Sequence, residues 1–255
     1  MKKIAYLLIL SLAFVACNSD DDSTPQTVNA TLSFNHFWDD TEIQNSDFDN
    51  TMFTNANGEE LNITRLRYLI SNVTFTDAQG NAFSAGNYNL VDVREGTGLA
   101  YQPDLSFPAG TYTVSFRFGF NDEDNQDGAY VDLNSAEWNV PAMLGGGYHY
   151  MQMDGTYINT EGEVMPYNFH TIRAAQPDMP NPPSELTDTS FEVVLGQYNI
   201  ELNGGVIEVE MNVAEWFKNP NQWDLNVLDT PLMPNYDAQI MMMENGEAGV
   251  FGPAE

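Results

Sequence analysis

Residues 61–73 read LNITRLRYLISNV, and this stretch decides the fold class. β-Branched and aromatic residues continue through Phe75, which predicts one long strand or two. A turn follows at residues 77–81 (DAQGN). An earlier strand begins near Val28, where alternate residues such as Leu32 and Phe34 share one face. Further strands are predicted at 88–93, 111–120, 148–157, 167–172, 191–195 and 206–213. About eight strands separated by Gly, Asn and Asp turns indicate an all-β protein, either a β-sandwich or a barrel. We expect an antiparallel β-sandwich of Greek-key type.

Two short helices are predicted near the C-terminal end. Residues 213–218 (VAEWFK) could form one helical turn that Pro220 stops, and residues 236–243 could form a second helix that Asn245-Gly246 ends. No linker divides the body of the chain. We therefore expect residues 28–255 to form a single domain.

Composition narrows the classes of partner. The 255 residues include 8 Lys+Arg and 37 Asp+Glu, for a net charge of −29. Nucleic acid is excluded as a partner, because its binding requires cationic side chains that release counterions. Anionic membrane surfaces are disfavoured for the same reason. Cations, neutral sugars and proteins remain possible partners.

The first residues predict export and lipidation. Two lysines precede about twelve apolar residues at 4–15, which is too short for a bilayer span but right for a signal peptide. Ala16-Cys17 then resembles a bacterial lipobox, and Cys17 is the only cysteine. We expect residues 1–16 to be a lipoprotein signal peptide and Cys17 to carry the lipid. The alternative is a free thiol beside an ordinary cleavage site.

We expect residues 17–27 to form an acidic flexible tether, because they are polar and include an Asp-rich run at 20–22. Such a run resembles the surface-export signal of Bacteroidota lipoproteins. The expected location is the outer membrane, with the lipid anchor as the only membrane contact. Both a periplasmic and an outward orientation stay open.

The only three histidines are His36, His149 and His170, and each falls in a predicted strand. Imidazole is a common ligand of borderline metals, although structural histidines are more frequent. Twelve methionines, including 241–243 (MMM), suit either Cu(I) or core filling. The sequence has no HExxH, GxSxG, CxxC or phosphate-binding loop, so we expect metal binding and not enzymatic turnover.

Two further patterns in the sequence are weaker. Residues 121–128 (NDEDNQDG) are rich in oxygen ligands, but an EF-hand alignment with Gly128 at position 6 places Asn134 at position 12. Calcium is therefore not favoured. Several aromatic residues could stack on sugars or be buried instead. They are Trp38, Trp138, Tyr148, Tyr150 and Tyr157.

Several segments taken in order resemble the copper-binding MbnP-like family, many members of which are Bacteroidota lipoproteins. The resemblance covers residues 28–252, and TRLRYLISN is its most specific piece. The segments are 34–38 (FNHFW), 61–73, 88–92 (YNLVD), 147–155 (GYHYMQMDG), 167–170 (YNFH) and 243–251.

The resemblance implies a β-sandwich that binds copper, as Cu(I) or Cu(II), outside the inner membrane. In relatives two histidines hold the metal, and His36 and His170 match those positions; His149 ranks third, because relatives have lysine there. An oxidised tryptophan (kynurenine) joins the site in relatives, with Trp38 and Trp138 as candidates here. A di-haem peroxidase-like protein is the partner associated with that oxidation.

The leading hypothesis is thus a lipid-anchored copper-binding protein for copper acquisition, storage or handling. The alternative is a surface glycan- or protein-binding lipoprotein whose histidines are structural.

Overall fold

The computed structural model describes residues 26–176, 183 and 185–254. The predicted signal peptide, Cys17 and the tether up to residue 25 lie outside the described residues. In the described part of the chain, no helix has the length and apolar character needed to cross a membrane.

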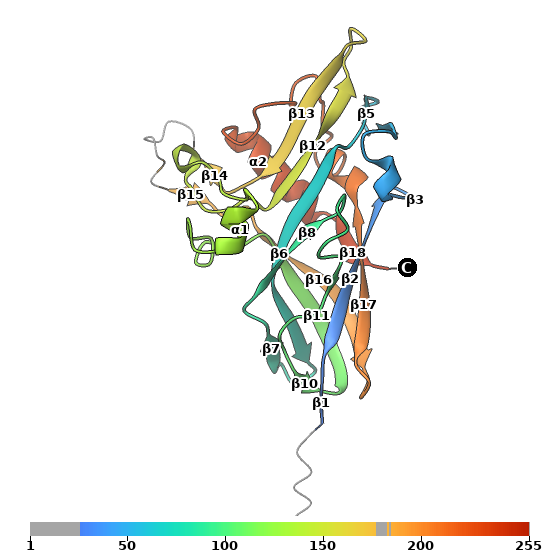
Figure 1. The fold of residues 1–255 in the computed structure, drawn as a ribbon, viewed down its shortest axis with the longest axis vertical. Helices are drawn as coiled ribbons and strands as arrows, with labels where there is room; N and C mark the ends of the chain where they lie inside the picture. Colours follow the sequence, from blue (N-terminus) through green and yellow to red (C-terminus); the bar gives the residue numbers. More distant parts are fainter. Residues whose placement is uncertain (1–25, 177–182, 184, 255) are drawn as a thin grey trace, which may run out of the picture.

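The elements are mostly strands (Figure 1). The first part of the chain forms β1 (Thr27–Val28), β2 (Ala30–Trp38), β3 (Thr41–Glu42), the 3-10 helix η1 (Asn45–Asp47), β4 (Phe53–Thr54), β5 (Glu60–Leu61), β6 (Arg65–Asp77), β7 (Ala82–Ser84) and β8 (Tyr88–Asp92). The middle forms β9 (Ala100–Tyr101), β10 (Phe107–Pro108), β11 (Gly110–Phe118), α1 (Val131–Ser135), η2 (Ala142–Leu144), β12 (Met151–Ile158) and β13 (Val164–Thr171). The rest forms β14 (Ala174–Ala175), β15 (Leu186–Thr187), β16 (Phe191–Ile200), β17 (Gly205–Asn212), η3 (Val213–Phe217), α2 (Tyr236–Glu247) and β18 (Phe251–Pro253).

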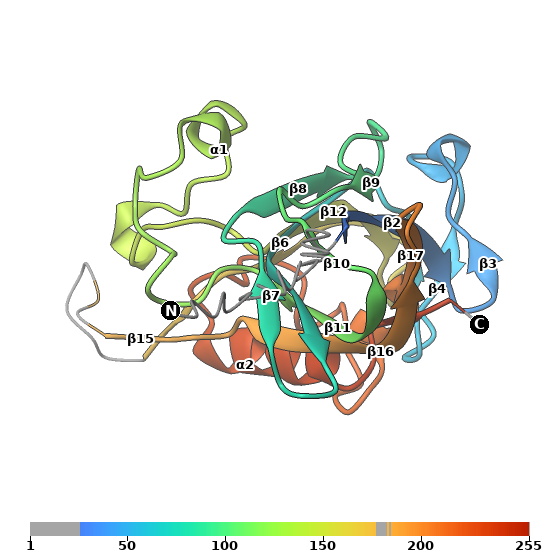
Figure 2. The same ribbon diagram turned by 90° about the horizontal axis from the view of Figure 1, so that it is seen from below.

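The strands form two large curled sheets, which confirms the predicted all-β sandwich. One sheet has nine strands, with β16, β11, β6 and β12 adjacent in that order. The other has five, with β18, β17, β2 and β3 adjacent in that order. Figure 2 shows the strands curling around a common interior. One pairing departs from the antiparallel prediction, because β2 runs parallel to β17.

Strand β6 is the centre of the larger sheet and coincides with the stretch that predicted the fold. It pairs with β8, β11 and β12, all antiparallel. The ring of Tyr68 on β6 lies edge-on to that of Phe34 on β2, with centroids 6.0 Å apart. Phe34 also meets Phe116 of β11 edge-on. These buried aromatic contacts join the two sheets and make up much of the core.

The C-terminal helix α2 runs four residues beyond the predicted end, through Asn245 and Gly246. Asn245 is fully buried, and its side chain donates hydrogen bonds to the carbonyl oxygens of Trp216 and Asn221. A Cβ on Gly246 would collide with the rings of Phe191 and Trp216. The Asn-Gly pair therefore serves tertiary packing here, not helix termination. Residues 213–217 form a 3-10 helix, and the short helix α1 was not predicted.

Candidate metal centre

Polar side chains gather on one face of strands β6, β12 and β13. The register places Arg67, Gln152 and His170 in one cross-strand row and Arg65, Asp154 and Asn168 in the next. Paired residues project from the same face of a sheet, and the intervening residues project from the other. The opposite face therefore carries the row of Leu66, Met153 and Phe169, which is fully buried in the core.

His170 is held at the end of β13 by a carboxylate. Its Nε2 lies 2.8 Å from Oδ1 of Asp154, and this oxygen also accepts a hydrogen bond from Nδ2 of Asn168. The other carboxylate oxygen, Oδ2, pairs with Arg65. Burial acts to raise the pKa of Asp154, but the hydrogen bonds from His170 and Asn168 and the charge of Arg65 lower it to about 2. The carboxylate is therefore ionised at neutral pH and keeps the proton of His170 on Nε2.

Helix α2 fixes the backbone that directly follows His170. The buried side chain of Gln239 donates to the carbonyl oxygen of His170 and accepts from the backbone N–H of Ile172, at 2.9 and 2.8 Å. Buried amides satisfied in this way hold the end of a strand in place.

His149 lies just before β12 and is held by a backbone carbonyl. Its Nδ1 lies 2.9 Å from the carbonyl oxygen of Trp138. Burial lowers the pKa of His149 to about 4, so the ring is neutral at pH 7. Since Nδ1 donates to the carbonyl, Nε2 carries the free lone pair.

The two imidazoles are neighbours, with ring centroids 5.4 Å apart in an edge-to-face arrangement. Within the described residues, Nε2 of His149 and Nδ1 of His170 are both buried and have no hydrogen-bond partner. Buried polar atoms normally have hydrogen-bond partners, so two such nitrogens on adjacent rings mark a candidate ligand site. The donor set fits copper, for which neutral imidazole is a favoured ligand. The described residues contain no cluster of three or more His, Cys, Asp or Glu with metal-binding spacing.

Trp138 is the tryptophan beside this pair. Its ring lies 5.8 Å from that of His149, and the guanidinium of Arg67 lies 5.1 Å from its ring centroid. Trp38, the other candidate, lies elsewhere: it stacks on Phe53 and donates its indole N–H to the carbonyl oxygen of Thr54.

His36 lies apart from the other two histidines. Its Nε2 is 3.0 Å from the hydroxyl of Tyr68, on the core face of β6, whereas His170 projects from the opposite face of the sheet. Burial lowers the pKa of His36 to about 3. The family pattern pairs His36 with His170, but the structure brings His170 together with His149.

The strand pattern of the sequence does not place His149 beside His170. Strands β12 and β13 form an antiparallel hairpin around Gly162, with Gln152 opposite His170. A hairpin brings residues equidistant from its turn together. His149 precedes Gln152 by three positions, so the strand period of two would place His149 on the face opposite to His170. The loop before β12 departs from this period and brings the two rings together.

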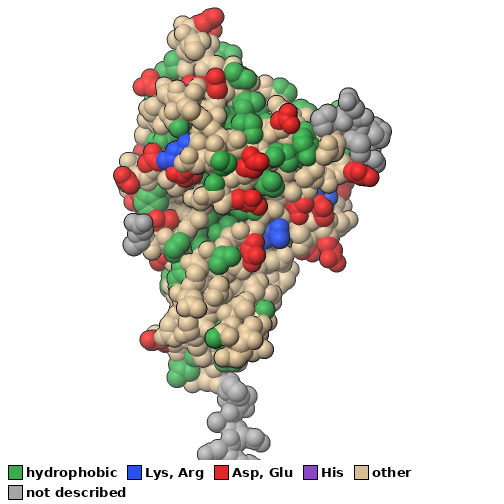
Figure 3. Space-filling view, turned by 180° about the vertical axis from the view of Figure 1, so that it is seen from behind, with side chains coloured by type: hydrophobic (Ala, Val, Ile, Leu, Met, Phe, Trp, Pro, Cys, Tyr) green, Lys and Arg blue, Asp and Glu red, His purple; other side chains and the backbone are tan. Residues whose placement is uncertain are grey.

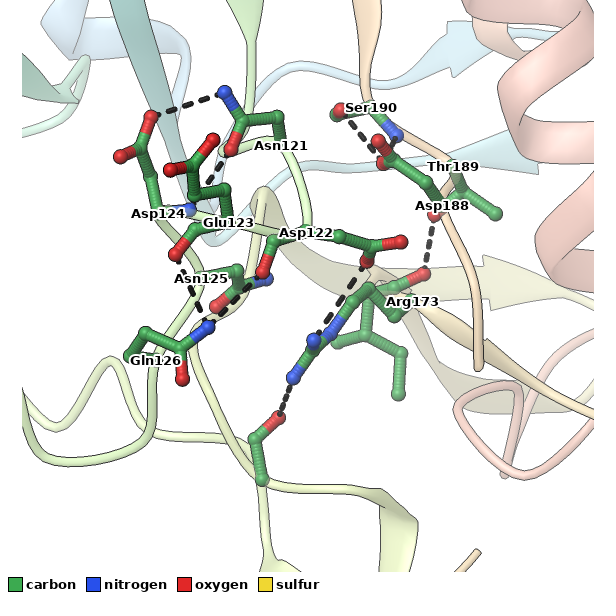
Figure 4. A network of polar contacts seen from close by, with 12 residues as sticks. Asn121, Asp122, Glu123, Asp124, Asn125, Gln126, Arg173, Asp188, Thr189 and Ser190 are labelled. Atoms are coloured by element: carbon green, nitrogen blue, oxygen red, sulfur yellow. Dashed lines mark hydrogen bonds and ion pairs between the residues drawn. The ribbon is translucent and has the colours of Figure 1, made fainter. Parts of the chain in front are cut away.

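Carboxylates of the acidic loop at residues 121–128 contact other side chains of the protein. Figure 4 shows the carboxylates of Asp122 and Asp124 pointing in different directions. Asp124 accepts from Nδ2 of Asn121 at 3.0 Å, and Asp122 lies 3.7 Å from Arg173. The aromatic residues that were candidates for sugar stacking, including Trp138 and Tyr148, are all buried and offer no open ring face.

The fold and site together define a β-sandwich with a buried pair of histidines at the end of one hairpin. The family model of MbnP matches residues 27–242, and the chain belongs to this family, which is linked to copper handling. Among solved structures, MbnP from Methylosinus trichosporium matches with a TM-score of 0.50 and 14% identity, over 77% of this chain and 79% of that chain. That likeness shows a shared fold. No curated protein sequence matches.

Proposed function

We propose that this protein binds copper through His149 and His170. The observation that carries the proposal is the pair of buried nitrogens without partners on neighbouring rings. Metal-binding histidines generally donate their other ring N–H to a carboxylate or backbone carbonyl, which fixes the tautomer. Asp154 and the carbonyl of Trp138 supply those two acceptors here. Copper is the best fit because it has the highest affinity of the first-row divalent metals for such ligands.

We further propose a lipid-anchored protein of the outer membrane that acquires, stores or handles copper. The support is the sequence around Cys17 and the acidic surface, which attracts cations by electrostatic steering. Binding is proposed instead of catalysis, because the polar groups around the histidines are used in orienting them. If a tryptophan is oxidised, the proposed partner in that oxidation is a di-haem peroxidase-like protein. Trp138 is then the residue concerned, since its ring lies beside His149.

The test is a copper titration of the chain from residue 18 onward against a competing chelator, with Cu(I) and Cu(II) in separate experiments. We expect His149→Gln and His170→Gln each to lower the affinity by at least tenfold, because each removes one nitrogen ligand. The matched control is His36→Gln, which changes the third histidine and should leave the affinity unchanged.

The outcomes separate the alternatives. Loss of copper only in His36→Gln would reject the pair and favour a site at His36. Wild-type protein that retains no copper after loading and desalting would reject copper binding and favour the glycan- or protein-binding alternative. Peptide mass spectrometry of protein purified from its own host tests oxidation at Trp138, with Trp38 as the internal control.

A further inference from the structure

One end of the domain is formed by the strand that receives the tether and by the β16–β17 turn. β1 begins at Thr27, and the parallel pairing of β2 with β17 sets Gly205 beside Ala30. A surface hollow joins the two segments. The described residues that line it include Val28, Leu202 and Val206, and none of them is charged.

This end exposes apolar side chains in an otherwise acidic molecule. Leu202 is 62% exposed and Val206 is 63% exposed. Figure 3 shows carboxylates crowded over the upper part of the molecule, whereas the part next to the grey tail is mostly uncharged. The nearest carboxylate in sequence is Glu201, directly before Leu202. Exposed apolar side chains on an end with few charges are a feature of surfaces that contact other molecules or lipid.

The tether keeps this end close to the membrane. Thr27 follows Cys17 by ten residues, so a lipid on Cys17 holds β1 within about 35 Å of the bilayer. An anchored surface meets the bilayer at a high effective concentration, so a small apolar contact suffices for binding. On the face that Figure 3 shows, most carboxylates lie toward the other end of the domain.

We propose that the end formed by β1 and the β16–β17 turn rests on a bilayer of zwitterionic lipids, with Leu202 and Val206 at the headgroup level. The inference rests on the lipid anchor of the proposed function and adds a protein surface to that anchor. Zwitterionic headgroups are specified because the net charge of −29 repels anionic ones.

Cysteine labelling tests this contact, because Cys17 is the only cysteine and its thiol is consumed by lipidation. Leu202→Cys receives an environment-sensitive fluorophore in the lipidated full chain, reconstituted into phosphatidylethanolamine–phosphatidylcholine vesicles. The matched control is Val164→Cys, which is 68% exposed at the start of β13, beside the tip of the β12–β13 hairpin at the opposite end of the domain. We expect a blue shift and quenching by brominated lipid at position 202 and neither at position 164.

Each other result overturns the inference. Protein that floats with the vesicles while the label at 202 stays in water rejects the contact but keeps the anchor. Protein that does not float rejects both. A blue shift that appears without vesicles and grows with protein concentration assigns Leu202 to a contact between copies of the chain, and also rejects the membrane contact.

Discussion

The imidazole rings of His149 and His170 lie edge to face with centroids 5.4 Å apart. One nitrogen of each ring is hydrogen-bonded, to the carbonyl oxygen of Trp138 and to Asp154 respectively. His149 comes from the loop before β12 and His170 from the end of β13, so the conformation of that loop sets their separation. Because these hydrogen bonds orient both rings, the two nitrogens without partners keep fixed positions. Such preorganisation favours tight metal binding, because little conformational freedom is lost on binding.

Asp154→Asn tests the role of the carboxylate behind His170. Replacing it removes the charge that keeps the proton of His170 on Nε2 and breaks the ion pair with Arg65. We expect copper affinity to fall about 10- to 100-fold, as for other groups that orient metal ligands. The measurement is competitive copper titration. Asp92→Asn on β8 is the control for the charge change, and an equal loss in both variants would contradict the proposed role.

The buried His36 predicts a pH-dependent stability in metal-free protein. Its pKa is about 3 in the folded state, against an ordinary value near 6.5 when unfolded. Between these values the unfolded chain binds a proton that the folded protein excludes, so the free energy of unfolding falls as pH falls. The slope from His36 is up to about 1.4 kcal/mol per pH unit.

Denaturant unfolding in EDTA between pH 4 and 7 measures this slope. In His36→Gln the slope should be shallower by about that amount, even where the variant is less stable throughout. His149, which is also buried and neutral, keeps its own contribution in both proteins. Parallel pH profiles for wild type and His36→Gln would show that His36 is protonated equally in both states.

Gly246→Ala should destabilise the protein although alanine is the better helix former. The gain in helix propensity is about 1 kcal/mol. The added Cβ, however, would collide with the rings of Phe191 and Trp216, and overpacking a core costs about 1–3 kcal/mol. We expect a lower thermal midpoint. Glu247→Ala, at an exposed position of the same helix, is the control and should change the thermal midpoint little. A higher midpoint in Gly246→Ala would contradict the prediction and show that the neighbouring rings can move to accommodate the added Cβ.

The loop at residues 121–128 should show no tight calcium site. Position 12 of the EF-hand alignment is Asn134, and Asp122 already faces Arg173. Micromolar calcium should leave the thermal midpoint unchanged. A rise of several degrees that disappears in Asp124→Ala/Asp127→Ala would overturn this expectation.

The strand content and the family could be predicted from the sequence because both depend on local pattern. The β-branched run at 61–73 becomes β5 and β6, and its TRLRYLISN segment falls in the part that matches the MbnP family. Helix ends and strand direction were less predictable. The parallel pairing of β2 with β17 and the passage of α2 through Asn245-Gly246 depend on neighbours that are distant in sequence.

The sequence by itself determined that three histidines fall on or beside strands in an acidic all-β protein. Only the tertiary structure decided which two meet. A period-two pattern tells which residues share a face of one strand but not which strand lies beside it. The loop before β12 brings His149 to His170, whereas β6 presents Tyr68 to His36 on the other face of the sheet. The environment of each histidine is therefore a property of the sheet order and of the loop conformation, which residues distant in sequence decide.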